Sequence, residues 1–165
     1  MTIKIGDKLP DATFTVMTAE GPKPMTTADM FGGKKVALFA VPGAYTPTCH
    51  KQHMPGFVGR AAELKAKGFD TVACTSVNDV FVLTNWAQDS GAAGNITMLA
   101  DGSADFAKKL GLDMDLTARG MGVRSRRYSM AVDNGVVTVL NVEELGPNFG
   151  VSSAETMCSM IDGSL

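Results

Sequence analysis

Short apolar runs and longer segments with a helical repeat alternate along the first two thirds of the chain. Apolar runs predict strands, and helical spacing of apolar residues predicts helices between them. We place strands at 13–17, 35–40, 71–77 and 96–100, and helices at 47–67, 80–89 and 104–110. The run at 35–40 is apolar almost throughout, which is typical of a strand covered on both faces. This alternation predicts an α/β fold.

A different pattern follows residue 126. Two apolar segments, 127–133 and 136–142, flank Asn134-Gly135, which is the strongest two-residue signal for a β-hairpin. The crossovers earlier in the chain require parallel strands, whereas this hairpin adds antiparallel ones. We therefore expect a central mixed sheet flanked by helices.

Two helices carry more specific predictions. Pro55 lies inside the helix at 47–67 and should kink it, because proline removes a backbone donor and clashes with the preceding turn. A last helix should begin near Ser152 or Ser153. Glu155 is placed to complete a capping box if Ser152 is the cap.

The composition narrows the class of protein. The 165 residues correspond to one domain, which we take as 1–165. A hydrophobic fraction of 45% and a charged fraction of 19% are ordinary for a globular chain. The net charge of −2 gives no general attraction to nucleic acid or anionic membranes. No apolar stretch approaches the roughly 20 residues of a membrane-spanning helix. We expect no nucleic-acid partner and no membrane.

The three cysteines, Cys49, Cys74 and Cys158, are an odd number and include no C-x-x-C pair. This count argues against a disulfide framework and against a four-cysteine zinc site. The first residues lack the apolar core of a signal peptide. We therefore expect free thiols in a reducing, cytoplasmic compartment.

The segment around Cys49 is a turn that begins a helix. Pro42 and Gly43 end the apolar strand. Thr46 is a candidate N-cap, and Pro47 occupies the first helical position, where its missing N–H costs nothing. Cys49 then falls in the first helical turn, near the positive end of the helix dipole and unpaired N–H groups. Such surroundings favour a thiolate over a thiol.

Four of the five arginines, Arg119, Arg124, Arg126 and Arg127, lie in one short stretch. Such a run can be a solvated loop face or an anion-binding patch. It can also supply a guanidinium to Cys49, which would favour the thiolate and orient an oxygen substrate. Arg127 differs from the others because it opens a predicted buried strand, where a charge requires a partner.

The spacing Pro42-x-x-x-Thr46-x-x-Cys49 resembles the active-site motif of the peroxiredoxin family. Further blocks, in the same order, resemble its type II, or peroxiredoxin-five, subfamily. These are Val41-Pro-Gly-Ala-Tyr-Thr-Pro-Thr-Cys49, His53-Met-Pro-Gly-Phe57, Ser76-Val77-Asn78-Asp79, Leu99-Ala100-Asp101 and Arg126-Arg127-Tyr128-Ser129-Met130. The blocks extend over nearly the whole chain. The resemblance implies a thioredoxin-like fold.

The resemblance also implies a thiol peroxidase that needs no cofactor and no metal. Cys49 would be the peroxidatic cysteine, whose thiolate attacks hydrogen peroxide or an alkyl hydroperoxide and becomes a sulfenic acid. Thr46 would hydrogen-bond the peroxide, and Pro42 would shield the site from water. Arg127 would hold both the thiolate and the bound peroxide.

Two further residues complete the expected site. The backbone N–H groups of Gly43 and Cys49 are candidate donors to the peroxide oxygens. His53, one helical turn after Cys49, matches a histidine of the family. A structural hydrogen bond is its expected role.

Recycling of the sulfenic acid must follow. Animal-type members carry a resolving cysteine in the loop before the last helix, but residues 146–153 contain none here. Cys158 lies in the predicted last helix and Cys74 in an apolar strand, where a cysteine packs as a small hydrophobe. We therefore expect no resolving cysteine. The plant and bacterial members commonly use glutathione and glutaredoxin on the peroxidatic cysteine alone, which implies a one-cysteine cycle. Thioredoxin is an alternative reductant, and the resemblance also implies a homodimer.

Three other functions compete with this interpretation. Cys49, His50 and His53 are close in sequence, but no fourth metal ligand accompanies them. A thioredoxin-type disulfide oxidoreductase is disfavoured because C-x-x-C is absent. A non-enzymatic peroxide sensor or holdase, in which oxidation of Cys49 changes partners, stays open.

Overall fold

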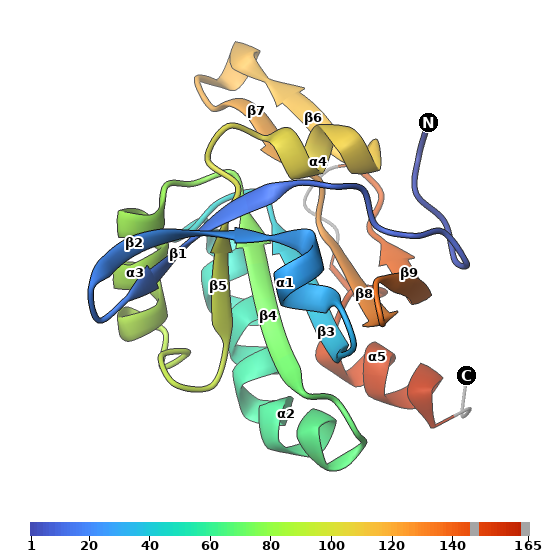
Figure 1. Cartoon of the computed structure of the whole chain (residues 1–165). Coiled ribbons are helices and arrows are strands. Elements are labelled where there is room, and N and C mark those ends of the chain that lie inside the picture. The colour runs from blue at the N-terminus through green and yellow to red at the C-terminus, as the bar shows by residue number, and fades with distance from the viewer. Residues whose placement is uncertain (146–148, 163–165) are drawn as a thin grey trace.

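A seven-stranded sheet forms the centre of the protein, and the computed structural model describes residues 1–145 and 149–162. The strand order is β2-β1-β5-β4-β3-β8-β9 (Figure 1). Its strands are β1 (Thr13–Thr18), β2 (Gly21–Thr26), β3 (Lys35–Val41), β4 (Thr71–Ser76), β5 (Thr97–Ala100), β8 (Tyr128–Asp133) and β9 (Val136–Val142). The helices are α1 (Thr27–Phe31), α2 (Met54–Ala66), α3 (Val80–Asp89), α4 (Asp105–Leu110) and α5 (Ala154–Ile161).

The sheet is mixed, as the sequence predicts. β3 pairs with β4 and β4 with β5 in parallel, because α2 and α3 carry the chain back across the sheet between them. β8 returns antiparallel beside β3, and β1 lies antiparallel beside β5. β3 therefore lies between β4 and β8, and residues that follow β3 or precede β8 meet at the same edge of the sheet.

Two hydrophobic clusters cover the two faces of this sheet. Phe39 of β3 points toward the cluster that contains α2, α3 and α5, and its ring stacks on Phe57 with centroids 4.1 Å apart. Its neighbour Leu38 points to the opposite face, which α1 and α4 cover. Both side chains are fully buried. The prediction that this strand is covered on both sides is confirmed.

The helix that follows β3 contains a wide turn. The chain is helical from Pro47, passes through a π-helical segment at Cys49–His53 and continues as α2. The N–H of Met54 donates to the carbonyl of Cys49, five residues back. We expected a kink at Pro55, but the irregularity lies in the turn before it. A proline cannot donate to a carbonyl four residues back, and this wide turn accommodates the missing donor.

The hairpin predicted at Asn134-Gly135 is confirmed. Both residues have positive φ, 48° and 79°, as a tight hairpin turn requires. The β8–β9 ladder begins at Tyr128 opposite Val142. One step beyond it, the N–H of Glu143 donates to the carbonyl of Arg127 at 3.0 Å. This last backbone contact places Glu143 directly beside Arg127.

Several elements were not predicted. The sequence of β2 contains two prolines and is typical of a loop. β2 is nevertheless a strand, because it lies at the edge of the sheet, where proline is tolerated. A separate hairpin of β6 (Asp113–Leu116) and β7 (Gly122–Ser125) projects from the sheet (Figure 1). Its strands have four residues each, too short for a clear alternation.

The predicted start of the last helix near Ser152 or Ser153 is confirmed. Ser153 caps α5, and its hydroxyl accepts from the N–H of Thr156. The capping box with Glu155 required Ser152 as the cap, and so it does not form. Ser152 is fully buried, and its hydroxyl donates to Glu143 instead.

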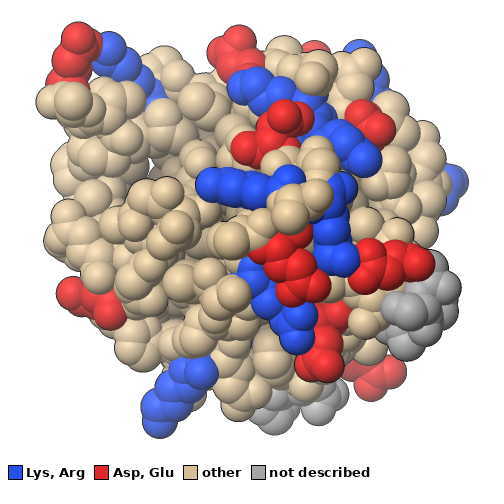
Figure 2. All heavy atoms as spheres, turned by 90° about the horizontal axis from the view of Figure 1, so that it is seen from below, with Lys and Arg blue, Asp and Glu red and all other residues tan. Residues whose placement is uncertain are grey.

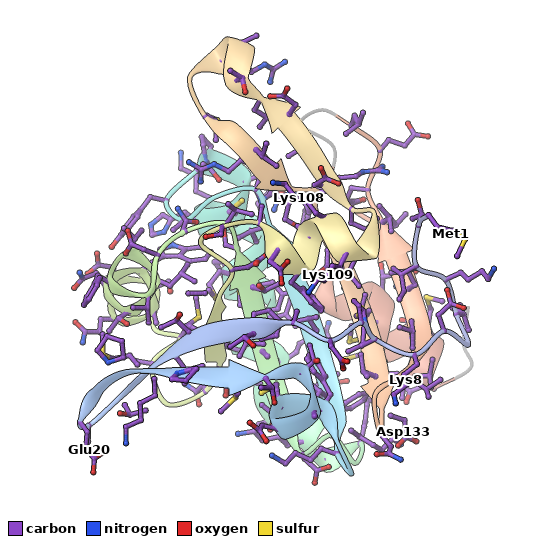
Figure 3. All side chains as sticks on the ribbon, turned by 45° about the horizontal axis from the view of Figure 1, so that its top comes forward. Met1, Lys8, Glu20, Lys108, Lys109 and Asp133 are labelled. Atoms are coloured by element: carbon purple, nitrogen blue, oxygen red, sulfur yellow. The ribbon has the colours of Figure 1, made fainter. Side chains whose placement is uncertain are left out.

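The N-terminal segment lies along the hairpin. The N–H of Gly6 donates to Val137, and Lys8 forms a bridge with Val136. Figure 3 shows Lys8 beside the Asp133 end of the hairpin. In the part of the chain described, no helix is long and apolar enough to cross a membrane. The face in Figure 2 carries acidic and basic side chains interspersed.

Candidate active site

The loop between β3 and the helix is anchored from the neighbouring strand. The N–H of Ala44 donates to Oδ1 of Asn78 at 3.0 Å, and the Ser76 hydroxyl lies 2.6 Å from the same oxygen. Ser76 ends β4, which is parallel to β3, so both residues lie at the carboxyl edge of the sheet. Tyr45 in this loop adopts a positive φ of 64°. The loop is thus held in one conformation by the strand beside it.

Cys49 and Arg127 are in direct contact. The Nη2 of Arg127 donates to the Sγ of Cys49 at 3.0 Å, and Cys49 is fully buried. Arg127 immediately precedes β8, whose pairing with β3 brings it to the end of β3 where the helix begins. The guanidinium thus places a positive charge and a directed donor against the sulfur. The helix start beside Cys49 adds the partial positive charge of unpaired N–H groups.

His53 connects Arg127 to the last loop of the chain. Its Nε2 lies 2.9 Å from the Ser152 carbonyl, which can only accept, so Nε2 carries the hydrogen. Nδ1 is then an acceptor for the Nη1 of Arg127 at 3.1 Å. Burial, and secondly the charge of Arg127, lowers the pKa of His53 to about 3. His53 is therefore neutral at physiological pH, in a structural hydrogen-bonding role.

Thr46 occupies the N-cap position, since its carbonyl accepts from the N–H of His50 at 2.9 Å. Its hydroxyl, however, donates to the Gly43 carbonyl at 2.6 Å rather than accepting from the helix. The hydroxyl hydrogen is thus engaged. Its lone pairs remain available to accept a hydrogen bond from a substrate O–H.

Gly43 is buried where side chains converge. A Cβ at this position would lie 3.2 Å from the Cγ2 of Thr46 and 3.3 Å from the Nη1 of Arg124. Both distances are tighter than ordinary contacts, so a larger residue would displace one neighbour. Pro42 precedes it and is half-buried. The structure therefore brings Pro42, Gly43 and Thr46 of one loop together with Cys49 at the start of the helix that follows, with Arg127 opposite.

The other arginines do not form a patch with Arg127. Arg124 donates to the carbonyls of Met121 and Val77, beside the active-site loop. Arg126 donates to the carbonyl of Glu143, and Arg119 is exposed. The run of four arginines is thus divided among separate structural tasks, with one at the thiol.

The remaining cysteines are buried away from solvent. Cys74 is fully buried in β4, and burial raises the pKa of its thiol well above the usual value. Cys158 is buried in α5 and its thiol pKa is also raised, chiefly by burial. All three cysteines are free thiols in the structure. Cys74 and Cys158 are packed in the interior, as the sequence predicts.

The two histidines have different partners. The Nδ1 of His50 accepts from the indole N–H of Trp86 at 2.9 Å, on the α3 side of the loop. His53 binds Arg127 and Ser152 instead. Among the described residues no group of three His, Cys, Asp or Glu side chains is arranged to hold a metal ion.

Several residues support the site in roles that the sequence did not predict. Asn78 holds the loop and Arg124 lies against Gly43. Glu143 and Ser152 hold His53 from the opposite side. The position of Asn78 just after an apolar strand was a usable signal. Glu143 had none, because a glutamate at a strand end is ordinary.

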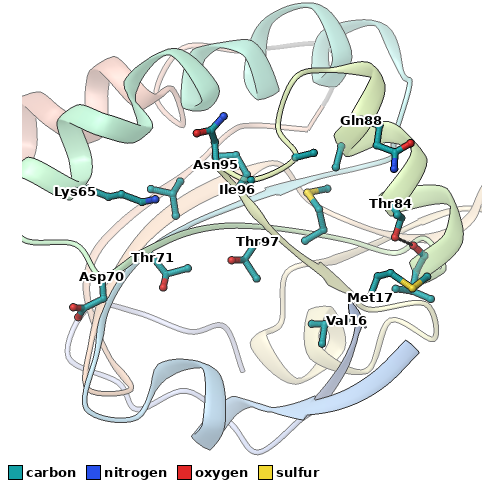
Figure 4. Close-up of a pocket in the computed structure, with 16 residues that line it drawn as sticks. Val16, Met17, Lys65, Asp70, Thr71, Thr84, Gln88, Asn95, Ile96 and Thr97 are labelled. Carbon is teal, nitrogen blue, oxygen red and sulfur yellow. Dashed lines mark hydrogen bonds between the residues drawn. The ribbon is translucent and has the colours of Figure 1, made fainter. Parts of the chain in front are cut away.

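A cavity of about 460 Å³ lies elsewhere, beside α3 and the ends of β1 and β5 (Figure 4). Thr84, Gln88 and Asn95 supply polar groups to its wall. None of the predicted site residues lines it. The candidate active site is therefore not this cavity but the surroundings of the buried Cys49 sulfur, where Arg127 and the loop residues meet.

Comparison with known proteins gives a consistent result. The family model described as Redoxin matches residues 4–158. Peroxiredoxin-2E of Arabidopsis thaliana, a chloroplastic protein, is 49% identical over 160 residues, covering 94% of this chain and 68% of the relative. Peroxiredoxin-2C of the same plant is 46% identical and covers 93% of this chain and 94% of the relative.

Solved structures agree with the sequence matches. Reduced Prx3 from Vibrio vulnificus in complex with hydrogen peroxide has a TM-score of 0.93 and 50% identity, covering 97% of this chain and 99% of that one. Peroxiredoxin 5 from Alvinella pompejana has a TM-score of 0.84 and 30% identity, covering 98% and 99%. The mixed sheet with flanking helices is thus the thioredoxin-like fold of these proteins. The chain therefore belongs to the redoxin family, as a peroxiredoxin of type II and hence a thiol peroxidase.

Proposed function

We propose that this peroxidase reduces hydrogen peroxide and alkyl hydroperoxides at Cys49 in a one-cysteine cycle. The observation that carries the proposal is the Arg127 guanidinium on the Cys49 sulfur, 3.0 Å away, at the start of a helix. The hydrogen peroxide named for the Vibrio vulnificus structure supports the smaller substrate.

In the first step the Cys49 thiolate attacks one oxygen of the peroxide. The S–O bond forms as the O–O bond breaks, and the proton of the attacked oxygen passes to the leaving oxygen, which departs as water or an alcohol and leaves Cys49 as a sulfenate that solvent protonates. Negative charge moves from sulfur to the leaving oxygen. Arg127 is placed to follow that charge, because a guanidinium offers several donors in one plane.

The peroxide would bind between Thr46 and Arg127. The Thr46 hydroxyl donates to Gly43, so it would accept from the peroxide O–H, while Arg127 and the N–H groups of Gly43 and Cys49 would donate. Pro42 would cover the site against water. Such an arrangement orients the oxygen for in-line attack by sulfur.

The distance of Cys158 from Cys49 and the burial of the Cys74 thiol favour an external reductant. Cys158 interacts electrostatically with Arg60 and Glu63, far along α2. The helical rise of about 1.5 Å per residue separates Cys49 from Glu63 by about 20 Å, whereas a disulfide needs Cα atoms within about 7 Å. Cys74 lies in the protein interior as a thiol, which is a poor nucleophile. Of the segment in which animal-type members hold a resolving cysteine, residues 146–148 lie outside the described residues.

The reductant we favour is glutathione with glutaredoxin. One glutathione would attack the sulfenic sulfur, releasing water and forming a mixed disulfide, and a second thiol would release the Cys49 thiolate. Because Cys49 is fully buried, this exchange requires the helix start to open. The wide turn at Cys49–His53 is a suitable place, since such turns interrupt regular helical bonding.

Thioredoxin is the second candidate reductant. We further propose that residues 1–165 form one domain and that the protein is a homodimer in a reducing, cytoplasmic compartment. Three cysteines without a C-x-x-C pair are typical of proteins in such a compartment. The experiment is steady-state peroxide consumption with glutathione and glutaredoxin, or with thioredoxin and its reductase. Turnover with the first pair supports the proposal. Turnover with the thioredoxin system alone overturns the choice of glutathione and glutaredoxin. Stoichiometric oxidation without turnover in both reductant systems favours a non-enzymatic peroxide sensor.

A further inference from the structure

The carboxylate of Glu143 gathers the segment that precedes α5. It accepts from the N–H groups of Gly150 and Val151, both at 2.9 Å, and from the Ser152 hydroxyl at 3.1 Å. Glu143 is only 5% exposed, and its carboxylate oxygens accept from backbone N–H groups and a hydroxyl rather than from a cationic side chain. Successive backbone N–H groups directed at one anion form a concave nest.

This nest fixes the acceptor for His53. The carbonyl of Ser152, whose own N–H and hydroxyl are directed at Glu143, receives the Nε2–H of His53 at 2.9 Å. A histidine with Nε2–H committed in this way must present a lone pair at Nδ1. That lone pair accepts from Arg127 at 3.1 Å.

Glu143 also holds Arg127 through the backbone. Its N–H donates to the Arg127 carbonyl at 3.0 Å, and its own carbonyl accepts from the Arg126 guanidinium at 2.8 Å. One residue therefore fixes both the main chain of Arg127 and, through Ser152 and His53, the orientation of its side chain. Among the described residues of this site, only Glu143 contacts both the Arg127 backbone and the Ser152 that holds His53.

We propose that Glu143 is a positioning residue for the peroxidase reaction: its carboxylate orders residues 150–152, which hold neutral His53 and so direct the Arg127 guanidinium at Cys49. This inference rests on the proposed function of Arg127 and Cys49. Side chains displaced by about 1 Å lose much of their catalytic effect, so loss of the nest should matter although Glu143 touches neither sulfur nor peroxide.

The test compares Glu143→Gln and Glu143→Asp with the unaltered chain. Glutamine keeps the size of the side chain but replaces one acceptor oxygen by a donor, which faces N–H groups and cannot be satisfied there. We expect the second-order rate with hydrogen peroxide to fall roughly 10- to 100-fold in Glu143→Gln, and to recover partly in Glu143→Asp. The thiolate fraction, followed by ultraviolet absorbance against pH, should fall with it.

The matched control is Glu144→Gln, which removes an exposed carboxylate one residue away. It should leave rate, thiolate titration and melting temperature unchanged. A double-mutant cycle then separates positioning from loss of stability. If Glu143 acts through His53, the rate loss from Glu143→Gln should nearly vanish in a His53→Ala background.

The outcomes are distinct. A native rate and titration in folded Glu143→Gln would overturn the inference, as would additive losses in the double mutant. If Arg127→Ala itself has no effect on rate or titration, the proposed function fails first. If Arg127→Ala is impaired and Glu143→Gln is not, the proposed function stands and only the role of Glu143 is wrong.

Discussion

The guanidinium of Arg127 is shared between Cys49 and His53: Nη2 donates to the sulfur at 3.0 Å and Nη1 to Nδ1 of the histidine at 3.1 Å. Nη2 thus faces the sulfur of Cys49, while His53 holds Nη1 in place. The arrangement sets an orientation as well as a charge at the thiol. Lysine supplies a charge with rotatable donors on a single nitrogen, but not two donor nitrogens held in one rigid plane.

Replacing Arg127 should therefore reduce the rate by more than ionisation explains. An ordinary thiol with a pKa of about 8.5 is about 3% ionised at pH 7, so full ionisation gains at most about 30-fold. Loss of a donor to developing charge costs roughly 100- to 1000-fold. Stopped-flow rates of peroxide reduction for Arg127→Ala and Arg127→Lys, divided by the measured thiolate fraction, check this. A corrected rate equal to that of the native chain in both variants contradicts it.

Thr46 should matter through its hydroxyl. Thr46→Val keeps the shape but removes the group that donates to Gly43 and accepts from the peroxide, and we expect a rate roughly 100-fold lower. Thr46→Ser is the matched control, because it retains the hydroxyl. Rates should be measured with the thiolate fraction of each variant. Equal losses in the two variants would mean that the methyl group, not the hydroxyl, is required.

Gly43→Ala tests the close approach in the loop. The added Cβ would lie 3.2 Å from the Thr46 methyl group and 3.3 Å from Arg124, so Thr46 must shift by a few tenths of an ångström. We expect roughly a 10-fold loss of peroxide rate from this displacement, with a small loss of stability. Gly59→Ala, a helical position with open space around it, is the control for adding a methyl group. Unchanged kinetics in Gly43→Ala would show that the loop yields without cost.

The lowered pKa of His53 should make the stability of the protein depend on pH. Its pKa is lowered from 6.5 to about 3 in the folded chain, so between these values the unfolded chain binds one more proton than the folded chain. The free energy of unfolding should therefore fall as pH decreases below 6.5, by up to about 1.4 kcal/mol per pH unit. Urea unfolding between pH 7 and pH 5 measures the slope.

His53→Gln should flatten this slope, whereas His50→Gln should retain it. These are the chain's two histidines, so the comparison is complete. An unchanged slope in His53→Gln would show that His53 titrates normally in the folded protein. Its neutral role beside Arg127 would then be wrong.

Much of the fold follows from local patterns. The apolar run of β3, the helix α3 and the turn at Asn134-Gly135 have unambiguous periodicity or turn chemistry. β2 and the β6–β7 hairpin escaped because short edge strands lack a hydrophobic pattern strong enough to distinguish them from loops. The wide turn at Cys49–His53 also has no sequence periodicity of its own.

The candidate site divides in the same way. Pro42, Thr46 and Cys49 lie in one segment, so their proximity can be predicted from spacing. The contact of Arg127 with Cys49 spans 78 positions and depends on β8 returning beside β3. Glu143 could not be predicted, because its role depends on tertiary contacts with a loop that sequence leaves undefined.

The most direct test of the account is intact-mass analysis after one equivalent of hydrogen peroxide, with a sulfenic-acid trap. The native chain is compared with Cys49→Ser, Cys74→Ser and Cys158→Ser. We predict that one oxygen, or one molecule of trap, is gained in every form except Cys49→Ser. Trapping that persists in Cys49→Ser, or an internal disulfide that disappears in Cys74→Ser or Cys158→Ser, would contradict a cycle carried by Cys49 alone.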